Sequence, residues 1–475
     1  MIDRLVLFGA SGDLAGRFLL PALARLQASR HIPQNFHLVG AAREGWDDVE
    51  FRHCASRHLE EHARDLSDAA RRSFVGRLRY RAVDFADPDT VADVVATALT
   101  SDHVPPSVEP VVAYLALPAA VFPAAVEALG GVGLPTGSRI VLEKPFGEDL
   151  DSAIRLNELL GRVVGVEGER AIFRVDHVLG MATVQNLLAV RLANRVLEPV
   201  WNSAHIEEVE LLWEETLGLE GRAGFYDRTG ALKDVIQNHL LQVLCLFAME
   251  PPVSLNERDL RDRKVDVLRS VRPLTESDAV RATRRARYTA GRLSDDGGAD
   301  GSVVPGYAEE EGIDPERGTE TFAEVTLEVG NWRWSGTRFV LRTGKALAAR
   351  RKQAIVRFRA VPDLPFANQA GQPAANELRI GLDGPYDLTL ALTGTASGPP
   401  AQLAPLPLIG QLAAPELPAY SRVLMDVLAG DSTLSIRGDE AELAWRILTP
   451  VIEAWARGRV PLLEYPAGSS GPTDS

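Results

Sequence analysis

Two residues far apart in the chain have the side chains needed to abstract a proton. Asp176 lies in the string Arg174-Val175-Asp176-His177, and His239 lies in the apolar stretch that begins at Val235. A histidine paired with a carboxylate can act as a general base, because the carboxylate fixes the imidazole tautomer and stabilises the imidazolium formed. A lone histidine on an apolar helix is more often a buried structural residue. The pair is therefore a hypothesis that needs further support.

A glycine-rich loop near the N-terminus indicates dinucleotide binding. The apolar run Arg4 to Ala10 predicts a buried strand, and it leads through the loop GASGDLA into a helical pattern. In such a GxxGxxA loop the first glycine permits the tight turn, and the second lets the backbone approach a pyrophosphate at the helix N-terminus. The residues expected to contact the cofactor are Gly9, Ser11, Gly12, Asp13 and Leu14.

Two further residues follow predicted strands at the edge where ligands of parallel sheets bind. Arg43 ends the second strand, where it could pair with a 2′-phosphate, so NADP is the expected cofactor. Glu44 comes next and leaves NAD open. Lys144 stands before Pro145 at the end of another strand, which favours a place at the cleft edge for this lysine.

The elements that must position these residues fall into two patterns. Residues 1–179 alternate short apolar runs with helical segments, which predicts βαβ units and a doubly wound parallel sheet of the Rossmann type. Residues 180–475 contain long helices followed by period-2 runs, which predict an α+β domain with a large, mostly antiparallel sheet. We expect residues 181–200 and 231–248 to be long helices. The Pro- and Ala-rich residues 403–418 suggest an irregular connection.

Composition excludes several classes of protein. The 475 residues carry 51 basic and 65 acidic side chains, a net charge of −14, which argues against nucleic-acid binding. The two cysteines, Cys54 and Cys245, form no CxxC motif, so neither a metal site nor a disulfide is expected. No apolar run reaches the roughly 18 residues typical of a membrane span, and a cytoplasmic protein is expected.

Seven segments together resemble the glucose-6-phosphate dehydrogenase family, in order from about residue 5 to residue 457. They are FGASGDLA, EKPFG, RVDHVLG with VQNLLAVRLANRVLEPVWN, GRAGFYD, DVIQNHLLQVLCLFAME, LRTGK, and AYSRVLMDVLAGDSTL with AWRILTPV. The segments containing RVDH and QNHLLQ are highly specific to that family.

The resemblance implies a reaction and a set of roles. Members of the family oxidise the C1 hydroxyl of glucose 6-phosphate to the δ-lactone, pass a hydride to NADP or NAD, and form homodimers or homotetramers through the large sheet. By motif position, His239 corresponds to the general base, Asp176 to its carboxylate partner, and Lys144 to a lysine that touches substrate and nicotinamide. The remaining substrate-binding positions implied by the resemblance are His177, for the 6-phosphate, and Glu215, Asp234, Lys345 and Arg350.

The chain departs from the family pattern at the phosphate site. Val178 and Met181 stand where the family has a tyrosine and a lysine that hold the phosphate with His177. Losing a charge-assisted hydrogen bond costs about 1.5–3 kcal/mol for each donor. One alternative is therefore a paralogue that oxidises C1 of a neutral or modified pyranose. Another, from a different class, is a non-catalytic regulatory partner that binds a sugar or nucleotide.

Overall fold

The computed structural model describes residues 1–100, 109–219, 221, 223–293, 301–363, 374–384, 386–396 and 402–473. Contacts divide the chain into two compact units. Unit 1 comprises Met1–Met181, Pro252–Asp262 and Pro415–Glu442, and unit 2 comprises Ala182–Pro251, Arg263–Ala414 and Leu443–Ser475. Within the described residues, no helix is both long and apolar enough to cross a membrane.

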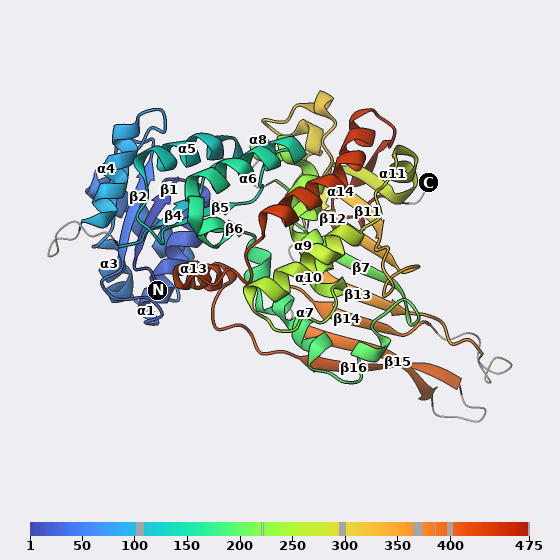
Figure 1. The fold of residues 1–475 in the computed structure, drawn as a ribbon. Helices are drawn as coiled ribbons and strands as arrows, with labels where there is room; N and C mark the ends of the chain where they lie inside the picture. Colours follow the sequence, from blue (N-terminus) through green and yellow to red (C-terminus); the bar gives the residue numbers. More distant parts are fainter. Residues whose placement is uncertain are drawn as a thin grey trace. The chain divides into compact units, whose positions relative to one another are not determined.

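Unit 1 is built on a parallel sheet in the order β3-β2-β1-β4-β5-β6, the strand order of doubly wound dinucleotide-binding folds. Helices flank the sheet (Figure 1). The strands are β1 (Arg4–Phe8), β2 (His37–Ala42), β3 (Arg79–Ala82), β4 (Val112–Leu115), β5 (Arg139–Glu143) and β6 (Ile172–Val175). The main helices are η1 (Ala15–Leu19), α1 (Leu20–Ala28), α2 (Asp48–His62), α3 (Asp68–Val75), α4 (Pro88–Leu99), α5 (Phe122–Val132), α6 (Leu150–Val164), η4 (His177–Gly180) and α13 (Ala419–Ala429). The predicted Rossmann-type sheet is confirmed.

The core of unit 1 draws on two distant parts of the chain. Apolar side chains of β1 and α1 form one buried cluster with Val423, Leu424, Val427 and Leu428 of α13. Burial of these side chains places α13 beside the N-terminal helices η1 and α1, although they are far apart in the sequence. The sequence pattern predicts a domain boundary near residue 179 and one continuous domain after it, residues 180–475. The division by contacts differs from it, because residues 252–262 and 415–442 pack with unit 1.

Unit 2 contains a nine-stranded sheet in the order β16-β15-β14-β13-β7-β12-β11-β8-β17. Its strands are β7 (Ile206–Glu214), β8 (Thr283–Thr289), β11 (Phe322–Glu328), β12 (Arg338–Gly344), β13 (Arg351–Phe358), β14 (Glu377–Gly381), β15 (Asp387–Ala396), β16 (Gln402–Gln411) and β17 (Leu462–Pro466). All neighbours are antiparallel except the pairs β7–β12 and β8–β17. The predicted large, mostly antiparallel sheet is confirmed (Figure 1).

The helices of unit 2 include α7 (Ala182–Leu192), α8 (Ala223–Ala231), η6 (Leu232–Leu240), α9 (Leu241–Ala248) and α11 (Glu276–Ala282). Two helices, α10 (Glu257–Ser270) and α14 (Gly438–Ala456), contain residues of both units. Helix α7 is shorter than the predicted 181–200. The predicted helix 231–248 is present, but its first half, η6, is a π-helix with i→i+5 hydrogen bonding.

One sequence-based expectation is wrong. Residues 403–418 were expected to be irregular, yet most of them form strand β16, which pairs antiparallel with β15. Pro405 and Pro407 lie opposite Thr393 and Ala391 in that ladder. Proline donates no backbone hydrogen bond and is therefore tolerated mainly on edge strands. Strand β16 is such an edge, so its prolines do not prevent pairing.

Candidate active site

The glycine-rich loop after β1 has a backbone that only small residues permit. Gly9 has φ +81°, and a Cβ there would lie 2.2 Å from the carbonyl oxygen of Ala116. A Cβ on Gly12 would lie 3.2 Å from the carbonyl oxygen of Gly9. No side chain caps the start of η1 at Leu14. The first N–H groups of that helix are therefore suited to a pyrophosphate, and the loop fits the expected dinucleotide.

Two residues predicted to contact the cofactor follow β2 and β5, on either side of β1 and β4 in the parallel sheet. Arg43 directly follows β2 and is exposed, as is Glu44. The hydroxyl of Ser11 donates a hydrogen bond to Glu44 Oε2 at 2.8 Å, which joins the glycine loop to the end of β2. On the other side of the switch point, Lys144 follows β5 and its peptide bond to Pro145 is cis.

Glu143, the residue before Lys144, is buried and close to other ionisable groups. Burial raises the pKa of Glu143 to about 8, the hydroxyl of Tyr114 that donates to it lowers that pKa, and Asp176 raises it. Its pKa in the folded protein thus lies above the ordinary value of roughly 4.3. The stabilisation that the protonated carboxyl gives is fully present below that value and is lost as the pH rises to about 8.

We therefore expect Glu143→Gln, which does not titrate, to gain stability relative to wild type between pH 5 and pH 8. The difference in unfolding free energy should grow by up to about 1.4 kcal/mol per pH unit. Urea denaturation at several pH values measures this slope. Glu148→Gln, at an exposed position five residues further on, is the matched control and should leave the slope unchanged. A pH-independent difference for Glu143→Gln would mean that this carboxyl does not titrate in that range.

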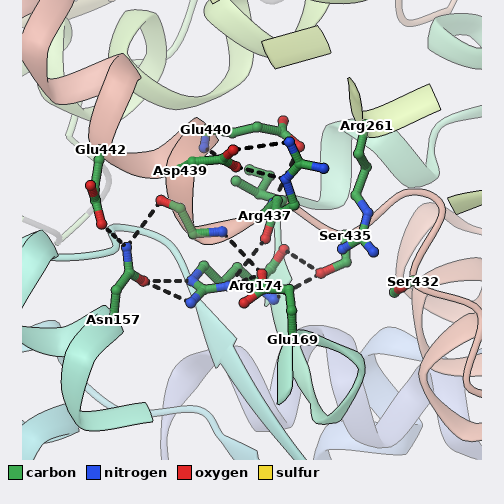
Figure 2. Close-up of polar contacts among 12 residues, drawn as sticks. Asn157, Glu169, Arg174, Arg261, Ser432, Ser435, Arg437, Asp439, Glu440 and Glu442 are labelled. Carbon is green, nitrogen blue, oxygen red and sulfur yellow. Dashed lines mark hydrogen bonds and ion pairs between the residues drawn. The ribbon is translucent and has the colours of Figure 1, made fainter. Parts of the chain in front are cut away.

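The strand that leads to Asp176 and His177 is held by a buried arginine (Figure 2). Arg174 on β6 is 1 % exposed, and its guanidinium contacts Glu169 at 2.6 Å and the side-chain oxygen of Asn157 at 2.7 and 3.1 Å. Its backbone N–H donates to the hydroxyl of Ser435 at 3.0 Å. These contacts fix the end of β6, and so the starting point of the segment that carries Asp176.

Asp176 begins a short helix beside α13. Its Oδ1 accepts the backbone N–H of Val178 at 3.0 Å, and the residue is 1 % exposed. A Cβ on Gly180 would lie 2.7 Å from the carbonyl oxygen of Ala419, so only glycine lets η4 approach α13 this closely. This approach brings the ring of His177 onto Tyr420, with centroids 5.4 Å apart and planes at 15°.

An aromatic series continues from Tyr420 to the helix after the glycine loop. The rings of Phe18 and Tyr420 are 5.4 Å apart, and the guanidinium of Arg17 lies 5.6 Å from the Phe18 ring. Arg17 also approaches the carboxylate of Asp13 at 3.6 Å. Tyr420 was missed in the sequence, although it lies in the family-like segment AYSRVL. By contrast, Val178 is fully buried, so a tyrosine introduced there would overpack the interior.

In unit 2, the π-helix η6 carries both Asp234 and His239. In an α-helix these residues, five apart, would point about 140° away from each other. The i→i+5 bonding gives a wider turn, so the fifth residue returns nearer to the direction of the first. His239 is 4 % exposed, and its ring centroid lies 5.7 Å from that of Trp213 on β7.

Three other predicted residues of unit 2 form charged clusters at the ends of β7, β12 and β13. Lys345 Nζ lies 2.7 Å from a carboxylate oxygen of Glu215, and Lys352 Nζ lies 3.7 Å from the other oxygen. Burial alone would raise the pKa of Glu215, but these two ammonium groups outweigh it and lower the pKa. Arg350 is not part of this pair and instead forms an ion pair with Asp383.

Lys352 and two aromatic residues were missed by the sequence reasoning. The Lys352 ammonium lies 4.3 Å from the centre of the Trp213 ring, and Lys345 lies 5.2 Å from the Tyr226 ring. Signals were available: Tyr226 lies in the family-like segment GRAGFYD, and Lys352 is two residues after the predicted Arg350. Together these residues give unit 2 a cluster of hydrogen-bond donors and acceptors suited to a polyhydroxylated or anionic ligand.

The parallel sheet with its glycine loop in unit 1, and the large sheet with the helix that carries the buried His239 in unit 2, are typical of a two-domain NAD(P)-dependent oxidoreductase. Residues 6–186 match the family description "Glucose-6-phosphate dehydrogenase, NAD binding domain", and residues 188–475 match "Glucose-6-phosphate dehydrogenase, C-terminal domain". The chain therefore belongs to the glucose-6-phosphate dehydrogenase family.

Individual relatives are similar over nearly their full length. The chain is 42 % identical to a glucose-6-phosphate 1-dehydrogenase of Mycolicibacterium smegmatis and 40 % identical to one of Rhizobium meliloti, each match covering 99 % of this chain and 94 % of the relative. A structure of glucose-6-phosphate dehydrogenase in complex with its substrate glucose-6-phosphate has a TM-score of 0.87 and 30 % identity, over 98 % of this chain and 95 % of that one. The Mycobacterium avium enzyme has a TM-score of 0.84 and 31 % identity, over 99 % and 95 %.

Proposed function

We propose that the protein oxidises the C1 hydroxyl of glucose 6-phosphate to the δ-lactone and transfers the hydride to NADP. The observation that carries this proposal is the π-helix η6, which combines Asp234 and His239 in a segment specific to the family. The full-length similarity to glucose-6-phosphate 1-dehydrogenases supports it. Initial rates with glucose 6-phosphate and with glucose, each with NADP and with NAD, test it directly.

The proposed roles follow from the chemistry of the step. A hydride leaves C1 only as the C1 hydroxyl loses its proton, so His239 takes that proton and Asp176 stabilises the imidazolium. NADP accepts the hydride when bound. Lys144, at the end of β5, orients the sugar and the nicotinamide, while Asp234, Glu215 and Lys345 bind sugar hydroxyl groups. Arg350 is proposed as a further cation for the substrate.

We propose that other residues of unit 1 form the binding site for the 6-phosphate. Val178 cannot present a hydroxyl, and Met181 carries no charge. Tyr420, which stacks on His177, has a hydroxyl group, and Phe18, which contacts Tyr420, is itself contacted by the guanidinium of Arg17. We propose that Tyr420 and Arg17 act with His177 as phosphate donors in place of the family's tyrosine and lysine.

NADP is proposed as the preferred cofactor because Arg43 follows β2. We expect Arg43→Ala to raise the KM for NADP roughly tenfold or more, through the loss of one charge-assisted bond, and to leave the KM for NAD nearly unchanged. The 2′-phosphate is the chemical difference between the two cofactors. Steady-state kinetics with each cofactor measures the ratio, and equal changes for both would contradict a role for Arg43 in 2′-phosphate binding.

A C1 dehydrogenase of a neutral or modified pyranose is the second candidate, and the absence of the family's tyrosine and lysine favours it. Comparable kcat/KM for glucose and glucose 6-phosphate would support it over the first proposal. A non-catalytic binding partner would reduce neither cofactor with any sugar.

A homodimer, or a homotetramer, is proposed as the assembly. Edge strand β16 exposes apolar side chains, with Leu406 at 47 %, Leu408 at 49 % and Ile409 at 67 % exposure. Such an edge is normally covered or blunted, because it promotes association. Light scattering of the purified protein determines the number of subunits. Location in the cytoplasm stays a prediction.

A further inference from the structure

The helix that carries Asp234 and His239 begins at a sharp change of backbone direction. Gly230, the second-last residue of α8, has the non-helical angles φ +68° and ψ 172°, and η6 starts at Leu232. Backbone angles of this kind are essentially restricted to glycine. The first N–H groups of any helix have no partner within the helix, so they must be held by other groups when they are buried.

Glu320, just before β11, supplies two of those partners. Its side-chain Oε1 accepts the backbone N–H of Leu232 at 2.9 Å, and its backbone oxygen accepts the N–H of Ala231 at 3.1 Å. The residue is 8 % exposed. One residue thus ties the start of η6 to the large sheet through both its main chain and its side chain.

The fit between Glu320 and the turn is tight. A Cβ at position 230 would lie 2.5 Å from Oε1 of Glu320, so any side chain there would displace the carboxylate. The carboxylate also borders a cleft of about 160 Å³, which is lined among others by Arg285, Lys233 and Arg317. Burial raises the pKa of Glu320 to about 7, while the Leu232 N–H, Arg285 and Lys233 lower that pKa.

Glu320 also lies near the sugar-binding candidates of unit 2. Burial is the largest cause of the raised pKa of Tyr226. The carboxylates of Asp234, Glu320 and Glu215 raise that pKa further. Tyr226 in turn lies 5.2 Å from the ammonium group of Lys345. A displacement of the start of η6 would therefore change the positions of Asp234 and the groups around it, which include Glu215.

We infer that Glu320 is a positioning residue: by holding the start of η6 it sets the direction in which Asp234 and His239 point. This inference rests on the proposed roles of those two residues. A misplacement of a reacting group by about 1 Å can cost roughly 10²-fold in rate. Glu320 thus acts through the helix and not by touching substrate or cofactor.

The test compares Glu320→Gln, which keeps an acceptor oxygen, with Glu320→Leu, which removes it. We expect kcat/KM for glucose 6-phosphate to fall roughly 10²-fold in the leucine variant and to stay within about threefold of wild type in the glutamine variant. The KM for NADP should not change, because the glycine loop lies in unit 1. Equal activity in the two variants would overturn the inference, whether both keep the wild-type activity or both lose it to the same extent.

A second pair of variants decides the matter if Glu320→Leu fails to fold. Gly230→Ala pushes against the Glu320 carboxylate, whereas Gly458→Ala places the same side chain at φ +67° with no atom within 4 Å. Both should lower the melting temperature, but only Gly230→Ala should lower kcat, by more than tenfold relative to Gly458→Ala. Equal kcat values would overturn the inference. Failure of the proposed base would appear separately, as retained activity in His239→Asn.

Discussion

Replacing His239 with asparagine is expected to lower kcat by roughly 10² to 10⁴, because a positioned general base contributes about that factor. Asparagine keeps a polar, hydrogen-bonding side chain at the buried position beside Trp213, but it cannot accept a proton from the substrate. The KM for NADP should change little, since the dinucleotide loop belongs to unit 1. Steady-state rates with glucose 6-phosphate measure the loss.

His205→Asn is the matched control for this prediction. His205 is an exposed histidine of the same unit, and its ring contacts Asn202 at 3.1 Å. The substitution should leave kcat unchanged. A His239→Asn variant that retains activity within a few-fold of wild type would remove His239 from the role of base.

The double variant Arg17→Ala/Tyr420→Phe is expected to raise the KM for glucose 6-phosphate by roughly 10² to 10⁴. Each residue is proposed as a charge-assisted donor to the phosphate, and each such bond is worth about 1.5–3 kcal/mol. The kinetics with glucose should be nearly unaffected, because glucose has no phosphate. Comparing the kinetic constants of the same variant for the two sugars separates a loss of phosphate binding from a general loss of activity.

Met181→Lys in the double-variant background provides the complementary measurement. An ammonium group at position 181 restores the family's cation and should recover part of the lost affinity for glucose 6-phosphate. An unchanged KM in Arg17→Ala/Tyr420→Phe would show that another group holds the phosphate, and Arg350 would be the next residue to replace. Val178→Tyr is a poor restoration, because the valine side chain has no exposed surface.

Much of the fold was predictable because its signals are local. The apolar run before Gly9 and the alternation of strands with helices gave the parallel sheet, since both depend on side-chain periodicity within a few residues. The period-2 runs of the second half gave the antiparallel sheet in the same way. Strand β16 was missed because its prolines signal a loop locally, while its place at a sheet edge is a property of the whole sheet.

The candidate site could be predicted only as a set of residue types. Motif positions in the sequence pointed to Asp176, His177, Asp234 and His239. The sequence did not show that Arg174 would be buried and held by Asn157 and Glu169, because those partners come from separate elements. Nor did it show Tyr420 beside His177, since these residues meet only after α13 has packed onto the N-terminal part of unit 1.

The type of fold, the dinucleotide loop and the family could be predicted from the sequence, because these depend on residue order and local geometry. The directions of the side chains that we propose to react depend on the tertiary structure. Spacing of five residues predicts directions about 140° apart on an α-helix, yet Asp234 and His239 lie on a π-helix, whose wider turn makes their directions more alike. That turn is held from outside the helix by Glu320, 88 residues from the Leu232 N–H that it accepts. Long-range hydrogen bonds of this kind form only in the folded chain, so no local pattern encodes them.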